Sequence, residues 1–446
     1  MDFLPHTDDD VRTMLQAIGV DSIGDLFEPV PRDVLLDGPL DVPPELSEVE
    51  LIDHLTELAA ASQGAGDLVC FAGGGAYDHY VPAAVRSLAG RAEFATSYTP
   101  YQPELSQGVL QAIYEFQTLV CELYGLEVAN ASLYDGGAAL AEAVTLAVRV
   151  TGREKVLVGG TVHPHYLDVL ETYTSGLGIE VVGVSPSGTG TVEWEAMDAD
   201  GAAAVVVASP NFFGLLEDVS GAAALAHDSG AIAVAVADPT AMGVLRAPGD
   251  AGIDVAVGEG TALGNALSYG GPSVGLFATR LDLVRQVPGR IAGATVDADG
   301  RRAFVLTLQA REQHIRRAKA TSNVCTNQTL MAIAAAVHLS WLGPGGLRRL
   351  GELCVRRTAV AAQRLGEVPG CRIRFTGPRF KEFVLETPRD GAELAAGLAQ
   401  RGFLVGPGLG RWYPDLANCL LVAVTERRTE GDIEGLAEAV EKELAD

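Results

Sequence analysis

The sequence predicts an α/β fold, in which a large domain with a mostly parallel central sheet is followed by a small C-terminal α+β domain. Two observations lead to this prediction. Between residues 155 and 278, short and nearly continuous apolar runs alternate with segments of helical periodicity, as in a parallel sheet that helices cover on both faces. Beyond residue 328, a long helical stretch precedes a region where strand and helix patterns mix, which is typical of a compact α+β unit.

The large domain is expected to contain a series of strands with helices between several of them. The strands are 155–158, 180–184, 203–208, 231–237, 254–257 and 274–278, and helical periodicity covers 165–177 and 221–229. Ligands of such sheets lie beyond the carboxyl ends of the strands. The loops that follow these strands are therefore the expected location of a site.

The remainder of the chain is predicted to form a long connecting helix and a small domain. The helix covers 329–341, breaks at Gly343-Pro344-Gly345-Gly346 and resumes over 347–366; after it come strands 372–375 and 382–386, helix 392–401, strand 420–424 and helix 429–444. We divide the chain into an N-terminal arm 1–65, a large domain 66–328 and a connecting helix with a small domain 329–446. This layout resembles that of fold-type I pyridoxal-phosphate-dependent transferases, the aspartate aminotransferase-like fold.

The N-terminal arm is predicted to be helical and broken by prolines. An amphipathic helix covers 8–18, a Pro-rich stretch covers 27–44, and a second helix covers 47–61, which Ser47 can cap with Glu50 three residues later. The arm has too little apolar surface for a core of its own. It either wraps another subunit or the main domain, or forms a small helical cap on its own chain.

Composition excludes several classes of function. A net charge of −26 argues against binding to nucleic acid or an anionic membrane, because both require a cationic surface. Spanning a membrane takes an uninterrupted apolar run of about 18 residues, and the sequence has no such run. Its acidic N-terminus is unlike a signal peptide. We therefore expect a soluble, cytoplasmic protein. The six cysteines are dispersed without zinc-ligand spacing, which favours free thiols and no metal site.

One acidic residue follows a buried-strand pattern at the place where pyridoxal-phosphate enzymes carry an Asp. Asp238 ends the apolar run Ala-Val-Ala and is followed by Pro-Thr, in the sequence Ala-Val-Ala-Asp-Pro-Thr at 235–240. In such enzymes this Asp pairs with the pyridinium nitrogen, and a lysine tethers the cofactor as a Schiff base. The chain has four lysines, Lys155, Lys319, Lys381 and Lys442. We expect the region facing Asp238 to lack a lysine amine. Lys155 begins a strand and Lys319 follows an Arg-rich helix, so neither is placed to face Asp238. We interpret Asp238 as orienting Thr240 and the following turn.

Several motifs identify a family. Residues 94–108, Phe-Ala-Thr-Ser-Tyr-Thr-Pro-Tyr-Gln-Pro-Glu-Leu-Ser-Gln-Gly, resemble a signature of glycine decarboxylase, the P-protein of the glycine cleavage system. Other stretches match the same family in order, at 71–82, 130–137, 209–214, 311–317 and 320–328. The resemblance covers essentially the whole chain and implies the fold-type I architecture.

The resemblance is to one half of a split enzyme. In many prokaryotes the P-protein consists of two homologous subunits, and this chain is similar to the alpha subunit. The family's cofactor lysine lies in a His-Lys sequence of the beta subunit, whereas the corresponding region here, 258–272, has no His-Lys. The resemblance thus implies that pyridoxal phosphate is bound by the beta subunit and not covalently by this chain, which is inactive alone. A heterodimer or a dimer of heterodimers, a heterotetramer, is the implied assembly.

The loop at 96–107 is implied to act in trans. In fold-type I dimers each active site takes residues from the facing subunit, so the resemblance implies that this loop completes the site of the beta subunit. The catalytic residues contributed in this way are Tyr98, Thr99, Tyr101, Gln102, Glu104, Ser106 and Gln107. Two prolines stiffen the loop. Without the resemblance, it reads as a Pro-rich connector before a helix.

Four other residues are interpreted as vestiges of a cofactor site. Gly136 and Gly137 open a helix whose N-terminus can hold a phosphate, and His163 has the position of a residue that stacks on a pyridine ring. Because the cofactor lysine is missing, we interpret these three residues and Asp238 as vestigial. His163 and His165 have no third metal ligand nearby in sequence, so we expect no metal.

Two further features keep two interpretations each. The glycines at 73–75 either let the backbone approach a ligand closely or form a turn. Arg290 and the Arg-rich segment 311–317 are candidates for an intersubunit region. A solvated helix face explains the segment equally well.

The implied reaction is the decarboxylation of glycine, with pyridoxal phosphate as the electron sink, and transfer of the aminomethyl group to the lipoyl arm of the H-protein. The implied partners are glycine, the beta subunit, which is glycine dehydrogenase subunit 2, and the lipoylated H-protein. Two other hypotheses remain: a self-sufficient pyridoxal-phosphate enzyme that uses an unexpected lysine, and a non-catalytic scaffold on a retired enzyme fold. The scaffold hypothesis requires that the loop at 98–107 be dispensable.

Overall fold

The computed structural model describes residues 5–36, 38–64, 66–95 and 98–445. Residues 96 and 97 of the predicted loop lie outside this part of the chain. The chain separates into two compact units, residues 1–63 and 64–446, and each is described by itself.

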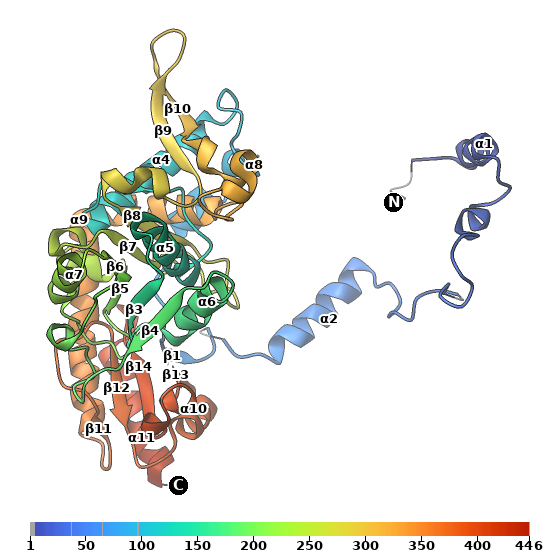
Figure 1. The fold of residues 1–446 in the computed structure, drawn as a ribbon. Helices are drawn as coiled ribbons and strands as arrows, with labels where there is room; N and C mark the ends of the chain where they lie inside the picture. The colour runs from blue at the N-terminus through green and yellow to red at the C-terminus, as the bar shows by residue number, and fades with distance from the viewer. Residues whose placement is uncertain (1–4, 37, 65, 96–97, 446) are drawn as a thin grey trace. The chain divides into compact units, whose positions relative to one another are not determined.

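The second unit is built on a seven-stranded sheet with the order β2-β8-β7-β6-β5-β3-β4 (Figure 1). Its strands are β2 (Val128–Ala129), β3 (Lys155–Gly159), β4 (Glu180–Val184), β5 (Ala202–Ser209), β6 (Ile232–Ala237), β7 (Val255–Glu259) and β8 (Gly275–Thr279). The strands from β7 to β4 run parallel, while β8 and β2 pair antiparallel at one edge. The predicted mostly parallel sheet is confirmed.

Helices cover both faces of this sheet, which explains the near-continuous apolar strands. They are α4 (Gln107–Tyr124), α5 (Gly136–Thr151), α6 (Pro164–Thr174) and α7 (Val219–Asp228). Alternate residues of β5 enter opposite cores: Val205 and Val207 pack with residues of α4 and α7, whereas Ala204 and Val206 pack with residues of α5 and α6. The period-two alternation of a strand thus fills two cores at once.

The connecting helix α9 (Thr329–Gly366) has the predicted break. Gly343 adopts φ 60° and ψ 178°, a left-handed conformation that glycine tolerates, and Pro344 follows it. By length and composition α9 is the one helix in the described ranges that could cross a membrane. It packs against α3 (Ala83–Ala89), α4 and α11 (Glu430–Ala445), and it carries a buried face.

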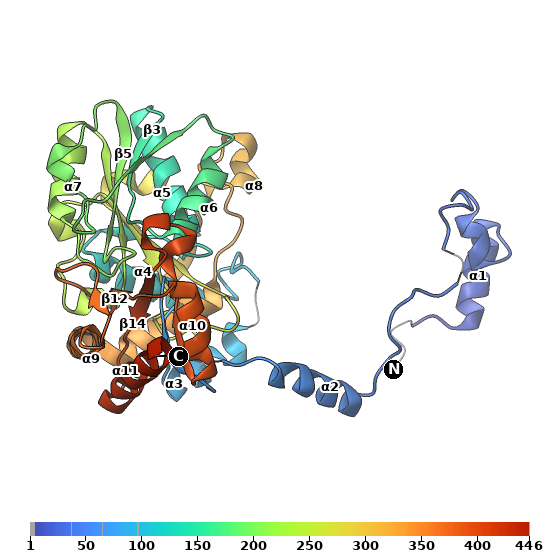
Figure 2. The same cartoon turned by 90° about the horizontal axis from the view of Figure 1, so that it is seen from below.

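The small domain contains an antiparallel sheet and a separate parallel pair. The sheet consists of β11 (Arg372–Ile373), β12 (Glu382–Glu386) and β14 (Cys419–Ala423), with α10 (Gly391–Gln400) and α11 packed near it (Figure 2). The parallel pair joins β1 (Val69–Ala72) to β13 (Phe403–Gly406), more than three hundred residues later. This pair is not predicted from the sequence, because it is formed by two short segments distant in sequence.

A hairpin, also unpredicted, projects from the large domain (Figure 1). Its strands β9 (Ile291–Val296) and β10 (Arg302–Thr307) pair antiparallel, and the short helix α8 (Gln313–Arg316) follows. Two glutamine side chains of α4 bind the hairpin, each through both the oxygen and the nitrogen of its amide. Gln107 bonds the backbone N–H and C=O of Phe304, and Gln117 bonds those of Ala292.

The first unit contains the predicted helices α1 (Asp8–Ile18) and α2 (Glu48–Ala60). Ser47 caps α2 as expected: its hydroxyl accepts from the N–H of Glu50, and the Glu50 carboxylate accepts from the N–H of Ser47. No residue of α1 or α2 is buried. The arm therefore lacks a buried core of its own among its described residues.

Candidate functional site

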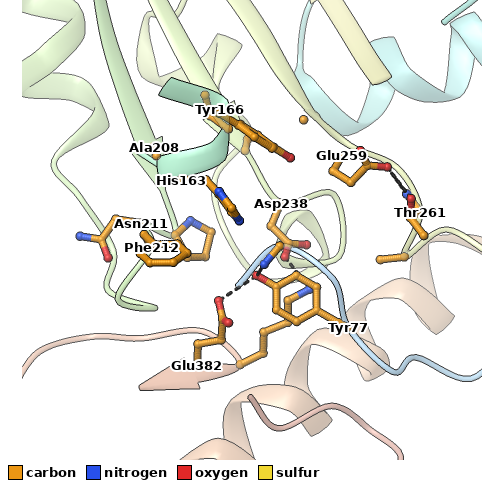
Figure 3. Close-up of a pocket in the computed structure, with 17 residues that line it drawn as sticks. Tyr77, His163, Tyr166, Ala208, Asn211, Phe212, Asp238, Glu259, Thr261 and Glu382 are labelled. Atoms are coloured by element: carbon orange, nitrogen blue, oxygen red, sulfur yellow. Dashed lines mark hydrogen bonds and ion pairs between the residues drawn. The ribbon is translucent and has the colours of Figure 1, made fainter. Parts of the chain in front are cut away.

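A small cavity lies beyond the carboxyl ends of β5, β6 and β7, which is where the topology predicts a site (Figure 3). The sheet supplies Asp238 after β6 and Glu259 at the end of β7, and the loop after β3 supplies His163. The small domain adds Lys381 and Glu382 at the start of β12. The cavity measures about 80 Å³, which is room for several water molecules.

Asp238 forms a buried ion pair with Lys381. The Lys381 ammonium lies 2.5 Å from Oδ2 of Asp238, and the lysine side chain is 1% exposed. Oδ1 of Asp238 accepts from the backbone N–H and the hydroxyl of Thr240, as the sequence analysis predicts. Burial raises the pKa of Asp238, but the charge and hydrogen bond of Lys381 outweigh burial and leave this pKa lowered. The expectation that no lysine faces Asp238 is wrong.

The hydrogen-bonding capacity of Lys381 is fully used. Besides Asp238, its ammonium donates to Oγ1 of Thr240 at 3.3 Å and to Nε2 of His79 at 3.2 Å, and it lies 3.5 Å from the ring centroid of Tyr77. Three donors thus meet three acceptors, with an aromatic face beside the charge. The Lys381 backbone has φ 45°, an unfavourable conformation for a non-glycine residue that places this ammonium in the cavity wall.

A second layer of polar groups supports Lys381. Nδ1 of His79 lies 2.7 Å from the Glu426 carboxylate, and because Nε2 accepts from Lys381, Nδ1 carries the proton. Burial raises the pKa of Glu426, but the hydrogen bond from His79 outweighs it and lowers this pKa to about 2. Cys354 completes a grouping with metal-ligand geometry. Its pKa is raised by burial to about 12, so the thiol stays protonated, and both nitrogens of His79 are already engaged.

Glu259 occupies the N-terminus of α5. Its carboxylate accepts from the N–H of Gly136 at 3.0 Å, from the N–H of Val274 at 3.2 Å, and from the N–H and hydroxyl of Thr261. Asp135 caps the same helix through the N–H of Ala138. Two carboxylates of the chain itself therefore satisfy donors of a helix N-terminus, the kind of site that otherwise binds phosphate.

The other predicted vestigial residues serve packing. A Cβ on Gly136 would meet the hydroxyl of Tyr166 at 2.3 Å, so this glycine makes room for the tyrosine. His163 stacks on Tyr166 with ring centroids 5.0 Å apart. Its Nε2 donates to the carbonyl of Gly74, while Nδ1 accepts from the N–H of His165. Burial, the largest cause, lowers the pKa of His163.

The glycine run at 73–75 brings the backbone close to side chains of the cavity. Gly74 N–H donates to Oε1 of Glu382 at 2.7 Å, and the hydroxyl of Tyr77 donates to Oε2 at 2.8 Å. A Cβ on Gly75, which has φ 96°, would meet the ring of His163 at 2.9 Å. The groups approached belong to the chain itself, so these contacts do not decide between approach to a ligand and a simple turn.

These residues do not fit pyridoxal phosphate. Asp238, the partner that a pyridinium nitrogen requires, is paired with Lys381. The helix terminus that would hold the phosphate already binds Glu259, and a phosphate there would meet two carboxylates, Glu259 and Asp135. Lys381 is bound to the same carboxylate with which a pyridinium nitrogen would pair, so its amine would not be free to form the Schiff base.

A second group of functional candidates lies outside the cavity, around Arg290. The Arg290 side chain, 4% exposed, donates to the hydroxyl of Tyr101 at 3.4 Å and to the carbonyl of Cys325 at 2.7 Å, and lies 4.0 Å from Glu312. The Tyr101 ring lies 5.9 Å from that of His314. We call Tyr101, Arg290, Glu312, His314 and residues 325–327 the Arg290 cluster. No residue of this cluster lines the cavity.

The predicted trans-acting residues lie beside this cluster. Tyr98 is 81% exposed, and Gln102 and Glu104 are exposed as well. Ser106 is buried at the start of α4, and both N–H groups of the Gln107 amide are engaged, with the carbonyls of Pro103 and Phe304. The structure thus brings the predicted residues together as one loop with an exposed and a buried side.

Three buried polar atoms in this region have no hydrogen-bond partner among the described residues: Thr99 Oγ1, Arg290 Nε and Glu312 Oε1. Such atoms are rare in folded proteins, because an unpaired buried group loses its hydration without compensation. Thr99 belongs to the loop at 98–107, whereas Arg290 and Glu312 belong to the Arg290 cluster beside it.

Sequence reasoning missed Lys381 and Glu259, and left the role of Arg290 open. Lys381 adjoins the apolar run of β12 and is one of only four lysines, which was the available signal. Glu259 follows the apolar strand β7 in the same way that Asp238 follows β6. An acid that ends a buried parallel strand is a candidate site residue by position alone.

Comparison with known proteins gives a consistent result. The family model described as glycine cleavage system P-protein matches residues 1–440. A probable glycine dehydrogenase (decarboxylating) subunit 1 from Carboxydothermus hydrogenoformans is 50% identical over 444 residues, covering 99% of each chain. The protein of the same description from Moorella thermoacetica is 48% identical and covers 100% of each chain.

Solved structures agree. A crystal structure of glycine decarboxylase (P-protein) in inhibitor-bound form matches with a TM-score of 0.92 and 46% identity over the full length of both chains. A cysteine desulfurase from Escherichia coli matches with a TM-score of 0.62 at 15% identity, covering 86% of this chain and 96% of that one, which shows the fold-type I architecture alone. The chain belongs to the glycine cleavage system P-protein family.

Proposed function

We propose that this chain is the alpha subunit of a two-subunit glycine decarboxylase, and that its loop at 98–107 and the Arg290 cluster complete the active site of a beta subunit. The relatives' designation as subunit 1 means that they belong to a split enzyme. In this proposal the beta subunit binds pyridoxal phosphate, which serves as the electron sink for decarboxylation, and a lipoylated H-protein receives the aminomethyl group.

One observation carries this proposal. Four of the stretches that match the family, 94–108, 130–137, 311–317 and 320–328, meet at the Arg290 cluster although they are distant in sequence. Asn327 joins the second of them, donating to the carbonyl of Ala131 at 2.9 Å, and Arg290 joins the others. This convergence lies outside the chain's own cavity. It includes buried polar atoms that have no hydrogen-bond partner among the described residues.

The chemistry of the loop suits an active site in trans. Tyr98, Gln102 and Glu104 present hydroxyl, amide and carboxylate groups on the exposed side. Ser106 and Gln107 lie on the buried side, where Gln107 fixes the loop against β10. Functional side chains held on a rigid support keep the geometry that catalysis requires. We therefore assign contact with the partner's site to the first group and positioning to the second.

The test is the exchange of carboxyl carbon between glycine and bicarbonate, catalysed by the complex of this chain with its beta subunit. Tyr98→Phe, Tyr101→Phe and Glu104→Gln should each leave assembly and cofactor content of the complex unchanged. Exchange should fall by about 10²-fold, the scale on which loss of one positioned polar or proton-transfer group acts.

Two matched controls separate a site from a general surface effect. Tyr173→Phe on α6 and Glu115→Gln on α4 make the same chemical changes outside the loop, and both should retain full exchange activity. If all three loop variants also retain near-normal exchange, the loop is structural. The chain is then a scaffold subunit, which is the alternative function for this fold.

A further inference from the structure

We infer that this chain fills its own ancestral cofactor site: the Glu259 carboxylate takes the place of the cofactor's phosphate, and the Lys381 ammonium takes the place of its pyridinium nitrogen. The inference concerns the cavity of this chain alone. It goes beyond the proposed function, which concerns residues that act on the partner, and its test uses a different measurement.

The first half of the argument is the anion site at α5. A fold-type I enzyme binds phosphate where a glycine-rich helix N-terminus presents free N–H groups. Here the N–H groups of Gly136 and Val274 and the hydroxyl of Thr261 converge on one carboxylate, that of Glu259. The hydrogen-bond donors of a phosphate site are thus present, and the Glu259 carboxylate is the anion that they bind.

The second half is the cation site at Asp238. This carboxylate lies at the end of a buried strand, where it would pair with a protonated ring nitrogen. Lys381 provides an equivalent positive charge at 2.5 Å and adopts a strained backbone to do so. Each charged end of the missing cofactor is thus replaced by a side chain of the same sign.

Polar satisfaction in the cavity supports this inference. None of the cavity-lining side chains within the described residues has a buried polar atom that lacks a hydrogen-bond partner. The Arg290 cluster, in contrast, has two such atoms, on Arg290 and Glu312. One site is therefore complete by itself and the other is not.

The replacement also links the two domains of the second unit. Asp238 follows a strand of the large sheet and Glu259 ends the next one, whereas Lys381 precedes a strand of the small domain. His79 and Glu426 extend the same network into the small domain, because Glu426 follows β14. An internal ion pair therefore joins the two domains at the cavity.

The direct test is binding of pyridoxal phosphate to the purified full chain, followed by equilibrium dialysis and by the shift of the melting temperature. The wild-type chain should bind none above background at millimolar concentration and give no borohydride-trapped adduct on Lys381. The double variant Glu259→Ser, Lys381→Ala vacates both ends, and it should bind the cofactor reversibly at least 10-fold better and melt at a higher temperature in its presence.

The control pair Glu441→Ser, Lys442→Ala makes the same changes on the exposed face of α11 and should gain no binding. The inference is overturned if the wild-type chain binds pyridoxal phosphate as well as the double variant does. It is also overturned if the folded double variant, checked by circular dichroism, gains no binding.

A rescue experiment keeps the inference testable should the double variant not fold. Lys381→Met leaves Asp238 buried without its partner and should lower the melting temperature by about 5 °C. Adding Asp238→Asn removes the stranded charge and should restore at least half of that loss. If the second change restores nothing, Lys381 and Asp238 do not act as a pair and the inference fails.

Discussion

At the scale of single residues, Glu382 is a buried acid whose charge is costly. Its carboxylate accepts from the N–H of Gly74 and the hydroxyl of Tyr77, both neutral donors, while Lys381 directs its hydrogen bonds to other groups. Burial raises the pKa of Glu382 to about 7 from its ordinary value of 4.5. Between these two pH values, the folded chain binds a proton that the unfolded chain releases.

This difference predicts the direction of a pH dependence. Because the native state binds more protons, the free energy of unfolding should fall as pH rises from about 4.5 to about 7, by at most about 3 kcal/mol. Glu382→Gln removes this titrating group. The difference in the free energy of unfolding, variant minus wild type, should therefore be more positive at pH 8 than at pH 5. Urea denaturation of the full chain at both pH values measures the effect.

Glu426 provides a control of opposite sign. Its pKa is lowered to about 2, so its contribution is complete above pH 4.5 and is lost only as pH falls toward 2. Glu426→Gln should therefore change the stability by the same amount at pH 5 and pH 8. Equal pH slopes for Glu382→Gln and the wild type would contradict the role given to Glu382.

At the scale of elements, α4 holds the β9–β10 hairpin through two side-chain amides that imitate a neighbouring strand. Gln107 pairs with Phe304 and Gln117 with Ala292, each donating to a carbonyl and accepting from an N–H of one residue. The same helix begins directly after the loop at 98–107. The hairpin and the loop are therefore positioned together.

Loss of either amide should loosen the hairpin. Gln107→Ala and Gln117→Ala each leave a backbone N–H and C=O without their partner, which should cost about 1–3 kcal/mol. Hydrogen exchange at 291–307 should become faster in both variants, whereas Gln111→Ala on the exposed side of α4 should leave it unchanged. Unaltered exchange in Gln107→Ala would show that strand pairing alone holds the hairpin.

At the scale of the whole molecule, the arm exposes an apolar face. Leu51, Ile52, Leu55 and Leu58 of α2 are each between 44% and 56% exposed and recur at helical spacing. An uncovered stripe of this kind is unfavourable in water. Two of the interpretations left open for the arm would bury this stripe, by wrapping either another subunit or the chain's own main domain.

Deletion of the residues before Ser62 should weaken association with the beta subunit more than it lowers the melting temperature of the remaining chain. Leu51→Asp with Leu58→Asp should act in the same direction and raise the dissociation constant by at least about 10-fold, since each buried leucine contributes about 1.5–3 kcal/mol. His54→Asp with Glu57→Gln is the matched control. Sedimentation and thermal melts separate the two effects, and equal losses in both would make the arm part of this chain's own core.

Local patterns determined much of the fold. The strands from β3 to β8 lie within one or two residues of their predicted ranges, because a parallel strand buried on both faces is apolar throughout. The break at Gly343 and the cap at Ser47 were also readable, since each depends on a few adjacent residues. The pairing of β1 with β13 was not, because neither short segment carries a signal of its distant partner.

The sequence by itself determined the family, the architecture and the loop at 98–107, because motifs and periodicity are local in the chain. Only the tertiary structure decided what faces Asp238. Lys381 lies more than one hundred residues away in sequence, and its meeting with Asp238 depends on how the small domain packs on the large one. The same holds for Glu259 at the N-terminus of α5 and for Arg290 beneath Tyr101. These charged residues pair with groups that are distant in sequence, and no local sequence pattern predicts such a pair.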